Sequence, residues 1–443
     1  FMRFIIFLVL VLMSSCMEEQ TRPQHFKKAN EKSSLAYENE NSDKIEIAVF
    51  PNVDLAYKEL IGEFQRENPD IKVEVKSRGF GDHHLMILEY LNANKKLPDI
   101  LLVEAGFIDG LSPIFEDLYS EPYNAKELQD SFFQYKWKMV SKNENSIIAI
   151  PLDISPACVW YRVDVFNEKN VKIEDIKTIE DLYAVGKTLT YDKDNNGKID
   201  HWLIPNVESI YEMILFSSQY RYFNKDGEAD LNNPTAALAI QWAKEFRKAG
   251  YDANVKEWTM DWYDGLYKGK FAYNISGAWL GWHLENWIAP EAKGKFRVAG
   301  LPALNKKSKP MNFNKGGSFL AIPKKISPER KLLAWKIVKW LTTRKENQIF
   351  TYNKADTLPA FMPAWEDKIF EEGISYIGGQ NPRPLWKEMA LDIKESYVKV
   401  ENFYARGFLY QALTDVLSDK KDVNEALEDA QKAFLRRLNQ LKF

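Results

Sequence analysis

Apolar side chains in the first part of the chain follow two spacings in turn. In KIEIAVF, residues 44–50, they occupy alternate positions, which is typical of a strand with one buried face. In the segment that follows, Ala56, Leu60 and Phe64 lie four residues apart and therefore share one face of a helix. Further strands are expected at 71–75 and 99–104, with a helix over 84–94 between them. This order predicts a parallel α/β sheet, whose ligands bind beyond the carboxyl ends of its strands.

A second series of elements begins after Pro156. ACVWYR, residues 157–162, predicts a strand, and the helix expected over 178–190 opens with Thr178 and Asp181 in capping-box spacing. Further expected elements are a helix over 233–250, short strands within 295–302 and 317–323, and a mostly helical segment from about 328 onward. The alternation of strand and helix therefore restarts in this part of the chain.

Composition narrows the classes of partner. The 443 residues carry 60 basic and 63 acidic side chains, with no basic stripe. Since nucleic-acid binding depends on such a surplus of positive charge, nucleic acid is excluded as a partner. Aromatic residues make up 14% of the chain and include 13 Trp. Aromatic rings fill cores, but they also stack on the apolar faces of sugar rings, so a concentration of them in loops would indicate a binding surface.

The first sixteen residues have the features of a lipoprotein signal peptide. MRFIIFLVLVLMSSC, residues 2–16, has a positive charge at Arg3, an apolar run too short to span a bilayer, and small residues directly before Cys16. Acylation of Cys16, with palmitate for example, would anchor the protein to a membrane of the cell envelope, outside the cytoplasm or in the periplasm. The polar segment 17–43 is expected to be a flexible tether. The alternative is a signal peptide in which Cys16 is incidental. The other cysteine, Cys158, is expected to be a small buried hydrophobe.

Four segments, in this order, resemble one known family. They are LPDILLVEAG (97–106), IPLDISPACVWYRVDVFNEKNV (150–171), LYKGKFAYNISGAWLGW (266–282) and VAGLPALNKKSKPMNFNKGGSFLAIP (298–323). Together they are similar to the lipoprotein-anchored solute-binding proteins of bacterial ABC importers, sugar-binding family 1, the maltose-binding-protein-like group. The similarity covers roughly residues 44–365. Arg162 stands where the family has Asn, and the family's Pro before the helix at 178 is absent.

The resemblance implies an α/β protein of the type II periplasmic-binding-protein fold, with two lobes joined by crossover hinge strands and a ligand cleft between them. The expected lobes are 44–153 with 315–350 and 154–314 with 351–443. The implied function is that of a monomer that binds a mono- or oligosaccharide, closes by a hinge motion and delivers the sugar to an ABC transporter permease. The resemblance implies no enzymatic activity.

Residues 191–202, YDKDNNGKIDHW, resemble the calcium loop of an EF-hand. The oxygen ligands expected at alternate positions come from Asp192, Asp194, Asn196, the Lys198 carbonyl and Asp200, with Gly197 at the tight turn. Leu203 stands where an EF-hand has its bidentate Glu, so one ligand is missing. The pattern predicts a structural Ca²⁺ that braces the second lobe. The alternative is a turn rich in Asp and Asn that binds nothing.

A run of tryptophans gives the best indication of the ligand. The candidate ligand-binding aromatic residues are Trp258, Trp262, Trp279 and Trp282, with Trp287 in the same stretch. Trp279 matches the Gly-x-Trp of the resembled family, which often lies against the solute. Stacking with a few hydrogen bonds is how carbohydrate is held, whereas each Trp taken singly is more often a core residue.

Polar candidates follow the expected strands, where loops converge on a ligand site. They are Asn52, Arg78, Asp82, Glu104, Asp153, Gly316 and Gly317. Each alone is more often a cap or a turn residue, and Asn52 or Asp54 could cap the helix that follows. His83 and His84 are adjacent and diverge on a helix or strand, so they are not expected to chelate a metal.

Two other functions fit the same pattern. A secreted carbohydrate-active enzyme would also have a Trp-rich cleft with Asp and Glu, and would be distinguished by a carboxylate pair at catalytic spacing with one raised pKa. A lipoprotein that senses a ligand for a membrane partner would have the same sequence features as a transport protein.

Overall fold

The computed structural model describes residues 43–441, which separate into two units. Unit 1 comprises residues 43–154, 316–367 and 397–400, and unit 2 comprises 155–315, 368–396 and 401–441. The signal peptide predicted over 1–16, its Cys16, and the tether except for its last residue lie outside the described residues. Within 43–441, no helix combines the length and the apolar character needed to cross a membrane.

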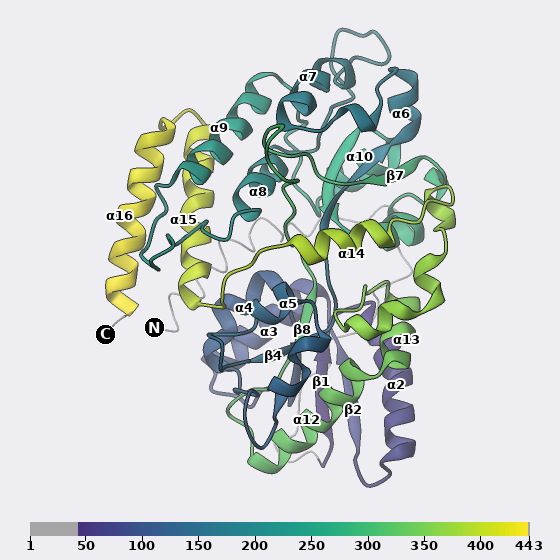
Figure 1. Ribbon diagram of the computed structural model, residues 1–443, viewed down its shortest axis with the longest axis vertical. Helices are drawn as coiled ribbons and strands as arrows, with labels where there is room; N and C mark the ends of the chain where they lie inside the picture. Colours follow the sequence, from purple (N-terminus) through teal and green to yellow (C-terminus); the bar gives the residue numbers. More distant parts are fainter. Residues whose placement is uncertain (1–42, 442–443) are drawn as a thin grey trace. The chain divides into compact units, whose positions relative to one another are not determined.

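Unit 1 is built on a five-stranded sheet with strand order β2, β1, β3, β8, β4 (Figure 1). The strands are β1 (Ile45–Val49), β2 (Val73–Ser77), β3 (Ile100–Glu104), β4 (Ala149–Pro151) and β8 (Ser318–Ala321). β1, β2 and β3 are parallel, as predicted, but β8 is antiparallel to both of its neighbours. The sheet is therefore mixed, because the strand between β3 and β4 comes from a much later segment that runs in the opposite direction.

The helices of unit 1 cover this sheet with the apolar faces that the sequence indicates. They are α2 (Val53–Glu67), α3 (Phe80–Asn92), α4 (Ala105–Leu111), α5 (Gln134–Lys138), α12 (Pro328–Thr343) and α13 (Lys345–Ala355). Ala56, Leu60 and Phe64 of α2 are buried, and the Phe64 ring meets the Trp340 ring of α12 edge-on at 5.5 Å. This contact closes the core between the helices, so the predicted helical face is confirmed.

Unit 2 contains a three-stranded sheet with β5 (Ala157–Arg162) in the centre, between β6 (Tyr273–Gly277) and β7 (Phe296–Ala299). Both outer strands are antiparallel to β5, so a sheet like that of the first lobe is not repeated here. The helices of unit 2 are α6 (Val163–Glu168), α7 (Ile179–Leu189), α8 (Glu208–Phe216), α9 (Pro234–Lys248), α10 (Met260–Lys268), α11 (Leu280–His283), α14 (Arg383–Asp392), α15 (Val400–Leu417) and α16 (Val423–Leu441). Figure 1 shows α9, α15 and α16 side by side, so helices dominate this unit.

Cap predictions had different outcomes in the two units. The α7 capping box is confirmed, because the Thr178 hydroxyl accepts from the Asp181 amide and the Asp181 carboxylate accepts from the Thr178 amide. Asn52 occupies the N-cap position of α2 but makes no side-chain cap bond, and Asp54 instead pairs with Lys58 at 2.8 Å. Asn52 has φ 81° and ψ −57°, a rare turn conformation that costs free energy. A capping residue ordinarily has extended backbone, so the conformation of Asn52 accounts for the missing cap bond.

Two stretches assigned to the second lobe, 351–367 and the short 397–400, lie in unit 1. For residues 351–367 the cause is α13, which packs against α2 and adds an ion pair between Lys354 and Glu59 at 2.8 Å.

Cys158 is fully buried in β5, as expected, and accepts a hydrogen bond from the Trp386 indole at 3.3 Å.

Candidate functional site

Two tryptophans form a partly exposed stacked pair in unit 2. The Trp258 and Trp279 rings lie 5.0 Å apart at an interplanar angle of 23°, and Trp258 remains 41% exposed. His283 meets both rings edge-on at 5.5 Å. Trp258 has φ 66°, a left-handed backbone conformation that is costly for a bulky residue and that often occurs at functional sites.

The remaining tryptophans of the run do not all share this position. Trp262 was predicted to bind ligand, but it is fully buried and packs beneath Trp258 with ring centroids 5.5 Å apart. That prediction is corrected: Trp262 is the third residue of α10, and its side chain is buried in the core of the unit. Trp282 and Trp287 are half-buried and surround His283 at 5.4 and 5.7 Å.

A charged cluster lies next to the tryptophan pair. Lys315 Nζ is 2.6 Å from a Glu212 oxygen and 3.3 Å from a Glu257 oxygen. The other oxygen of Glu212 accepts a 2.5 Å hydrogen bond from the Tyr410 hydroxyl. The side chains of Lys315, Glu212 and Glu257 are 14%, 17% and 26% exposed, so the ion pairs are only partly hydrated.

Lys315 joins the charged cluster to the aromatic pair. Its backbone carbonyl accepts a 2.9 Å hydrogen bond from Trp279 Nε1 and a 2.6 Å hydrogen bond from the Ser155 hydroxyl. Glu257 directly precedes Trp258 in the chain, and Glu208 lies one helical turn before Glu212 on α8. We call this set the tryptophan–carboxylate surface; it consists of Trp258, Trp279, His283, Glu208, Glu212, Glu257, Lys315 and Tyr410.

Burial and charge perturb the acids and bases of this surface. Burial raises the pKa of Glu208, and the neighbouring Glu212 carboxylate raises it further. Burial also raises the pKa of Glu257, against the opposing effect of Lys315. For Lys315, burial alone would lower the pKa, but Glu212 and Glu257 outweigh it and hold the pKa above its usual range. Burial lowers the pKa of His283, which is therefore neutral at pH 7.

The sequence alone did not indicate the charged half of this surface. Glu208, Glu212, Glu257, Lys315 and Tyr410 come from four distant segments, and acidic residues are common on helices. Two local signals were available: Glu208 and Glu212 have the i, i+4 spacing that places both on one helix face, and Lys315 directly precedes the predicted Gly316 and Gly317.

In unit 1, several predicted polar residues lie at the carboxyl ends of the strands. Asn52 follows β1, Arg78 follows β2, and Glu104 ends β3. The Glu104 carboxylate accepts a 2.7 Å hydrogen bond from the Gly106 amide, so this side chain caps α4. Asp82 is exposed in the first turn of α3. A ligand-binding role for these residues stays a prediction.

An aromatic cluster that the sequence did not indicate lies at the same strand ends. Phe50, Phe80 and Phe107 surround His84, whose ring stacks on Phe107 at 3.9 Å, and Phe80 is 47% exposed. Burial lowers the pKa of His83 to about 4 and that of His84 to about 3, so both are neutral at pH 7. His83 Nε2 contacts the Leu102 carbonyl at 2.7 Å. Both histidines are core residues, and their rings meet edge-on with centroids 5.0 Å apart.

Asp153, Gly316 and Gly317 lie together beside β8. The Asp153 carboxylate accepts a 2.5 Å hydrogen bond from the Ser318 amide. Gly316 and Gly317 have φ 96° and 81°, which only glycine adopts readily, and a Cβ on Gly317 would lie 2.7 Å from Lys136 Nζ. Burial raises the pKa of Asp153 to about 6, against the opposing charge of Lys136.

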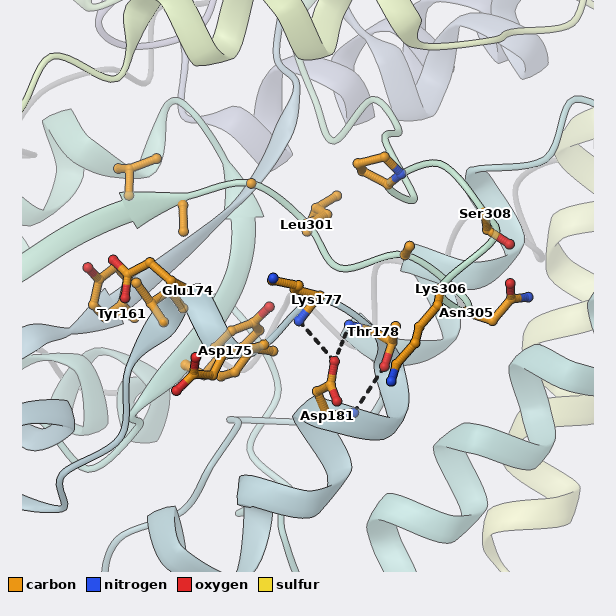
Figure 2. A pocket seen from close by; sticks show the side chains of 18 of the residues that line it. Tyr161, Glu174, Asp175, Lys177, Thr178, Asp181, Leu301, Asn305, Lys306 and Ser308 are labelled. Carbon is orange, nitrogen blue, oxygen red and sulfur yellow. Dashed lines mark hydrogen bonds between the residues drawn. The ribbon is translucent and has the colours of Figure 1, made fainter.

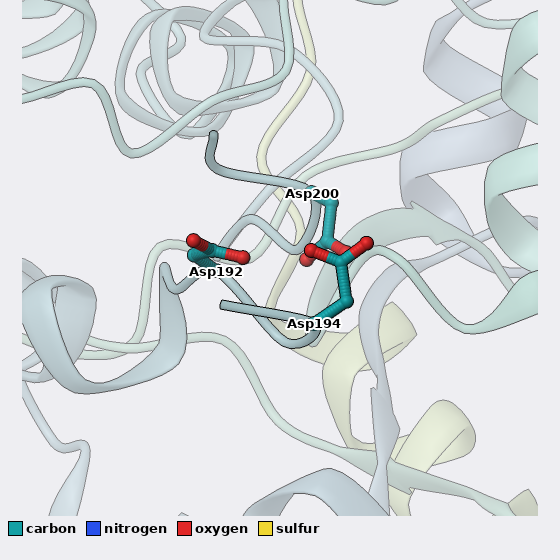
Figure 3. Close-up of side chains that lie close together, drawn as sticks. All are labelled: Asp192, Asp194 and Asp200. Carbon is teal, nitrogen blue, oxygen red and sulfur yellow. The ribbon is translucent and has the colours of Figure 1, made fainter. Parts of the chain in front are cut away.

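The predicted calcium loop brings three carboxylates together (Figure 3). Oxygen atoms of Asp192, Asp194 and Asp200 all lie within 4.8 Å of one another. Asp192 also accepts from the Gly197 amide at 2.6 Å, and the Asn196 side-chain oxygen accepts from the Lys198 amide at 2.9 Å. Hard oxygen ligands at this spacing suit Ca²⁺, and the Asn196 side-chain oxygen has a second lone pair with which to coordinate it.

A separate pocket of about 960 Å³ opens in unit 2 beside β7 and the start of α7 (Figure 2). Its charged lining includes Glu174, Asp175, Lys177 and Lys306, and so has both signs. Asp181 on its wall is engaged in the α7 capping box. None of the predicted ligand-binding residues lines this pocket, so it is distinct from the tryptophan–carboxylate surface.

Two α/β units, built from segments that cross between them more than once, define the two-lobed class of solute-binding proteins. Residues 59–372 match the family model described as bacterial extracellular solute-binding protein. The chain belongs to this family, which places it outside the cytoplasm.

Known proteins similar to this chain agree with that assignment. The arabinooligosaccharide-binding protein of Bacillus subtilis (strain 168) is 23% identical over 401 residues, which cover 84% of this chain and 87% of that protein. An extracellular solute-binding protein of family 1 has a similar structure, with a TM-score of 0.74, 19% identity, and coverage of 89% and 99% of the two chains. The ABC transporter associated binding protein from B. animalis subsp. lactis Bl-04, in complex with β-1,6-galactobiose, gives a TM-score of 0.73 at 20% identity and coverage of 91% and 99%. The two-lobed fold expected from the sequence is confirmed.

Proposed function

We propose that this protein binds a mono- or oligosaccharide at the tryptophan–carboxylate surface and delivers it to an ABC transporter permease. The observation that carries the proposal is the exposed, stacked Trp258–Trp279 pair beside partly buried carboxylates, in a member of the solute-binding family. Indole faces stack on the apolar faces of sugar rings, and carboxylates accept hydrogen bonds from sugar hydroxyls. Binding rather than catalysis is the proposed role, and hinge closure around the ligand stays a prediction.

The similar proteins support a carbohydrate ligand and a transport role. One is named for arabinooligosaccharides, and another is described as associated with an ABC transporter and holds a galactose disaccharide. These names favour transport over the alternative of ligand sensing. At sequence identities of 20–23%, two binding proteins can differ in the sugar they bind, so the proposal names the saccharide class and no particular sugar.

A panel of mono- and oligosaccharides, measured by thermal shift and then by calorimetry, tests the proposal. A saccharide at a hundredfold excess over Kd should raise the free energy of unfolding by about 2.7 kcal/mol, because it binds only the folded protein. The proposal fails if no saccharide in the panel shifts the melting temperature.

One observation favours a second candidate, a carbohydrate-active enzyme. Glu208 and Glu257 both have raised pKa values, and the nearby Glu212 carboxylate contributes to each. A carboxyl group with a raised pKa beside a second carboxylate is also what glycoside hydrolysis uses. Against this, Glu212 is held by Lys315 and Tyr410, which leaves it poorly placed to act as a nucleophile. Incubation of the protein with a bound oligosaccharide, followed by mass analysis, decides between the two: shorter products that disappear in Glu208→Gln would establish the enzyme.

We also propose a structural Ca²⁺ in the 192–200 loop. The support is the convergence of three carboxylates within 4.8 Å at positions matching a calcium loop. Calcium is plentiful outside the cytoplasm, so even a weak site would stay filled. The ion would brace the loop and take no part in binding sugar.

A lipid anchor at Cys16 is proposed from the sequence alone. The apolar run and the small residues before Cys16 support it, and the family's location outside the cytoplasm is compatible with it. The full chain should enter the detergent phase on extraction, and Cys16→Ser should remain in the aqueous phase. Equal partitioning of the two proteins would exclude the anchor.

A further inference from the structure

We propose that Trp287 and Tyr263 form a second stacking subsite, so that the bound saccharide is an oligosaccharide with one ring at the Trp258–Trp279 pair and another at Trp287. This inference rests on the proposed function and specifies the length of the ligand at the same site. It is carried by a continuous row of aromatic rings, by a change of helix type that aligns them, and by a hydrogen-bond acceptor within the row.

The row of rings extends beyond the Trp258–Trp279 pair through His283. The centroids of Trp279 and Trp287 lie 5.5 and 5.7 Å from that of His283, and the Tyr263 ring of α10 meets Trp287 edge-on at 4.9 Å. Because a helix rises about 1.5 Å per residue, Trp279 and Trp287 are separated along the axis by on the order of 10 Å. One sugar ring, which is about as wide as one aromatic ring, cannot stack on both.

The helix that carries the row changes its winding at His283. Trp279 directly precedes α11, which ends at His283, and a π-helical turn follows over Leu284–Ile288. In an α-helix, a step of four residues exceeds a full turn by about 40°. In the wider π-turn the same step falls short of a full turn, so the step from His283 to Trp287 opposes the rotation of the step from Trp279 to His283. The π-turn therefore brings the three rings back toward one line, and such turns frequently occur at functional sites.

His283 places a hydrogen-bond acceptor between the two ends of the row. Its Nδ1 donates to the Trp279 carbonyl at 3.0 Å, and because the ring is neutral, Nε2 is left as an acceptor. Nε2 makes no hydrogen bond within residues 43–441. A sugar chain presents apolar ring faces and hydroxyl donors at their edges, which is the combination that this row can receive.

The exposure of the outer rings differs from that of a core aromatic residue in the same stretch. Trp262 is 0% exposed, as a residue that only fills the core should be. Trp287 and Tyr263 are instead half-buried, like Trp279 and His283, so part of each ring remains accessible to a ligand. The accessible surface therefore continues from Trp258 to the outer end of the row.

Three series of saccharides of increasing length test the inference. They are α-1,4-linked glucose, β-1,4-linked xylose and 1,5-linked arabinose, each with one to four rings, and affinities are measured by calorimetry with the full chain. In a series that binds, the affinity should rise with length by at least about tenfold in total, because the added rings gain an aromatic partner at Trp287. A monosaccharide that binds as tightly as the longer members overturns the inference and leaves the proposed function standing.

Trp287→Ala separates a binding role from a structural one. It should lower the affinity for the longest member about tenfold and leave the affinity for the monosaccharide unchanged, whereas a purely structural role would weaken both equally. Tyr263→Ala, which removes only the outermost ring, replaces it if Trp287→Ala does not fold. The matched control is Tyr267→Ala, which removes a 49% exposed ring one turn further along α10 and should leave every affinity unchanged.

The remaining outcomes are distinguishable from one another. A folded Trp287→Ala protein with the length dependence of the unmodified protein overturns the second subsite and leaves the proposed function standing. An equal loss of affinity for all members does the same. The absence of binding in every series overturns the proposed function together with the subsite.

Discussion

Trp258 combines an exposed ring with a backbone conformation that does not suit its side chain. A φ of 66° costs free energy for Trp258 but would cost almost none for a glycine at this position. The Trp258 ring is also the most accessible part of the tryptophan–carboxylate surface. Trp258→Gly should therefore weaken saccharide binding by about 1–3 kcal/mol while the free energy of unfolding stays the same or rises by up to about 1 kcal/mol. Calorimetry and denaturant unfolding measure the two effects.

The control for this change is Tyr267→Ala, which removes a 49% exposed aromatic ring from α10. Its affinity for the same saccharide should equal that of the unmodified protein. A folded Trp258→Gly protein with unchanged affinity would remove Trp258 from the binding site. Loss of both stability and affinity would instead indicate that the ring holds Trp279 and Trp262 in place.

Asp153 should give unit 1 a recognisable dependence of stability on pH. Its pKa is about 6 in the folded protein, against 3.8 for an unperturbed Asp, so folding favours the protonated carboxyl. The stabilisation this group provides is fully present below about pH 4 and is lost as the pH rises to about 6, a change of about 3 kcal/mol. Comparison with Asp153→Asn isolates the effect, because the amide does not titrate.

Denaturant unfolding of both proteins at several pH values measures this difference. Relative to Asp153→Asn, the unmodified protein should lose stability between about pH 4 and pH 6 and change little above. A difference that stays constant across the series would show that folding does not raise the pKa of Asp153.

At the scale of elements, Lys315 connects the segment before β8 to α8 through Glu212. Lys315→Met should lower the free energy of unfolding by about 3–5 kcal/mol, because Glu212 and Glu257 would keep their partly buried charges without a cation. Adding Glu212→Gln should recover part of this loss. Lys309→Met is the control, since the Lys309–Asp392 pair has a 78% exposed lysine and should cost at most about 1 kcal/mol. Equal losses in Lys315→Met and Lys309→Met would contradict the role given to the buried pair.

The elements also show which parts of the structure the sequence could indicate. Helices α2 and α7 could be predicted from local sequence. In α2 the apolar residues recur every four positions, and in α7 the capping Thr178 stands three residues before Asp181. The direction of β8 and the antiparallel sheet of unit 2 do not, because strand pairing depends on segments more than 100 residues away. The site divides in the same way. The tryptophans were visible as a run, whereas Glu212, Lys315 and Tyr410 come together only through tertiary folding.

At the scale of the whole molecule, the two units differ in how they are stabilised. The sheet of unit 1 has five strands, and that of unit 2 has three within a larger set of helices and loops. The predicted calcium loop, with Asp192, Asp194 and Asp200, belongs to unit 2 and joins α7 to the segment that leads into α8. Removal of an ion from this loop should therefore affect the folding of unit 2 and leave unit 1 unchanged.

This leads to a prediction for calcium that separates the units. With free calcium at tenfold its Kd, the ion stabilises the fold by about 1.4 kcal/mol, so a chelator should lower the melting temperature by a few degrees. Hydrogen exchange should show the loss of protection in 155–315 and no change in β1, β2 and β3. Asp192→Asn should abolish the response to chelator, whereas Asp226→Asn, in another exposed loop of unit 2, should retain it. Saccharide affinity measured well below the melting temperature should stay the same, because the loop takes no part in the tryptophan–carboxylate surface. If chelator changes neither the melting temperature nor the exchange, the three carboxylates form a hydrogen-bonded turn without an ion.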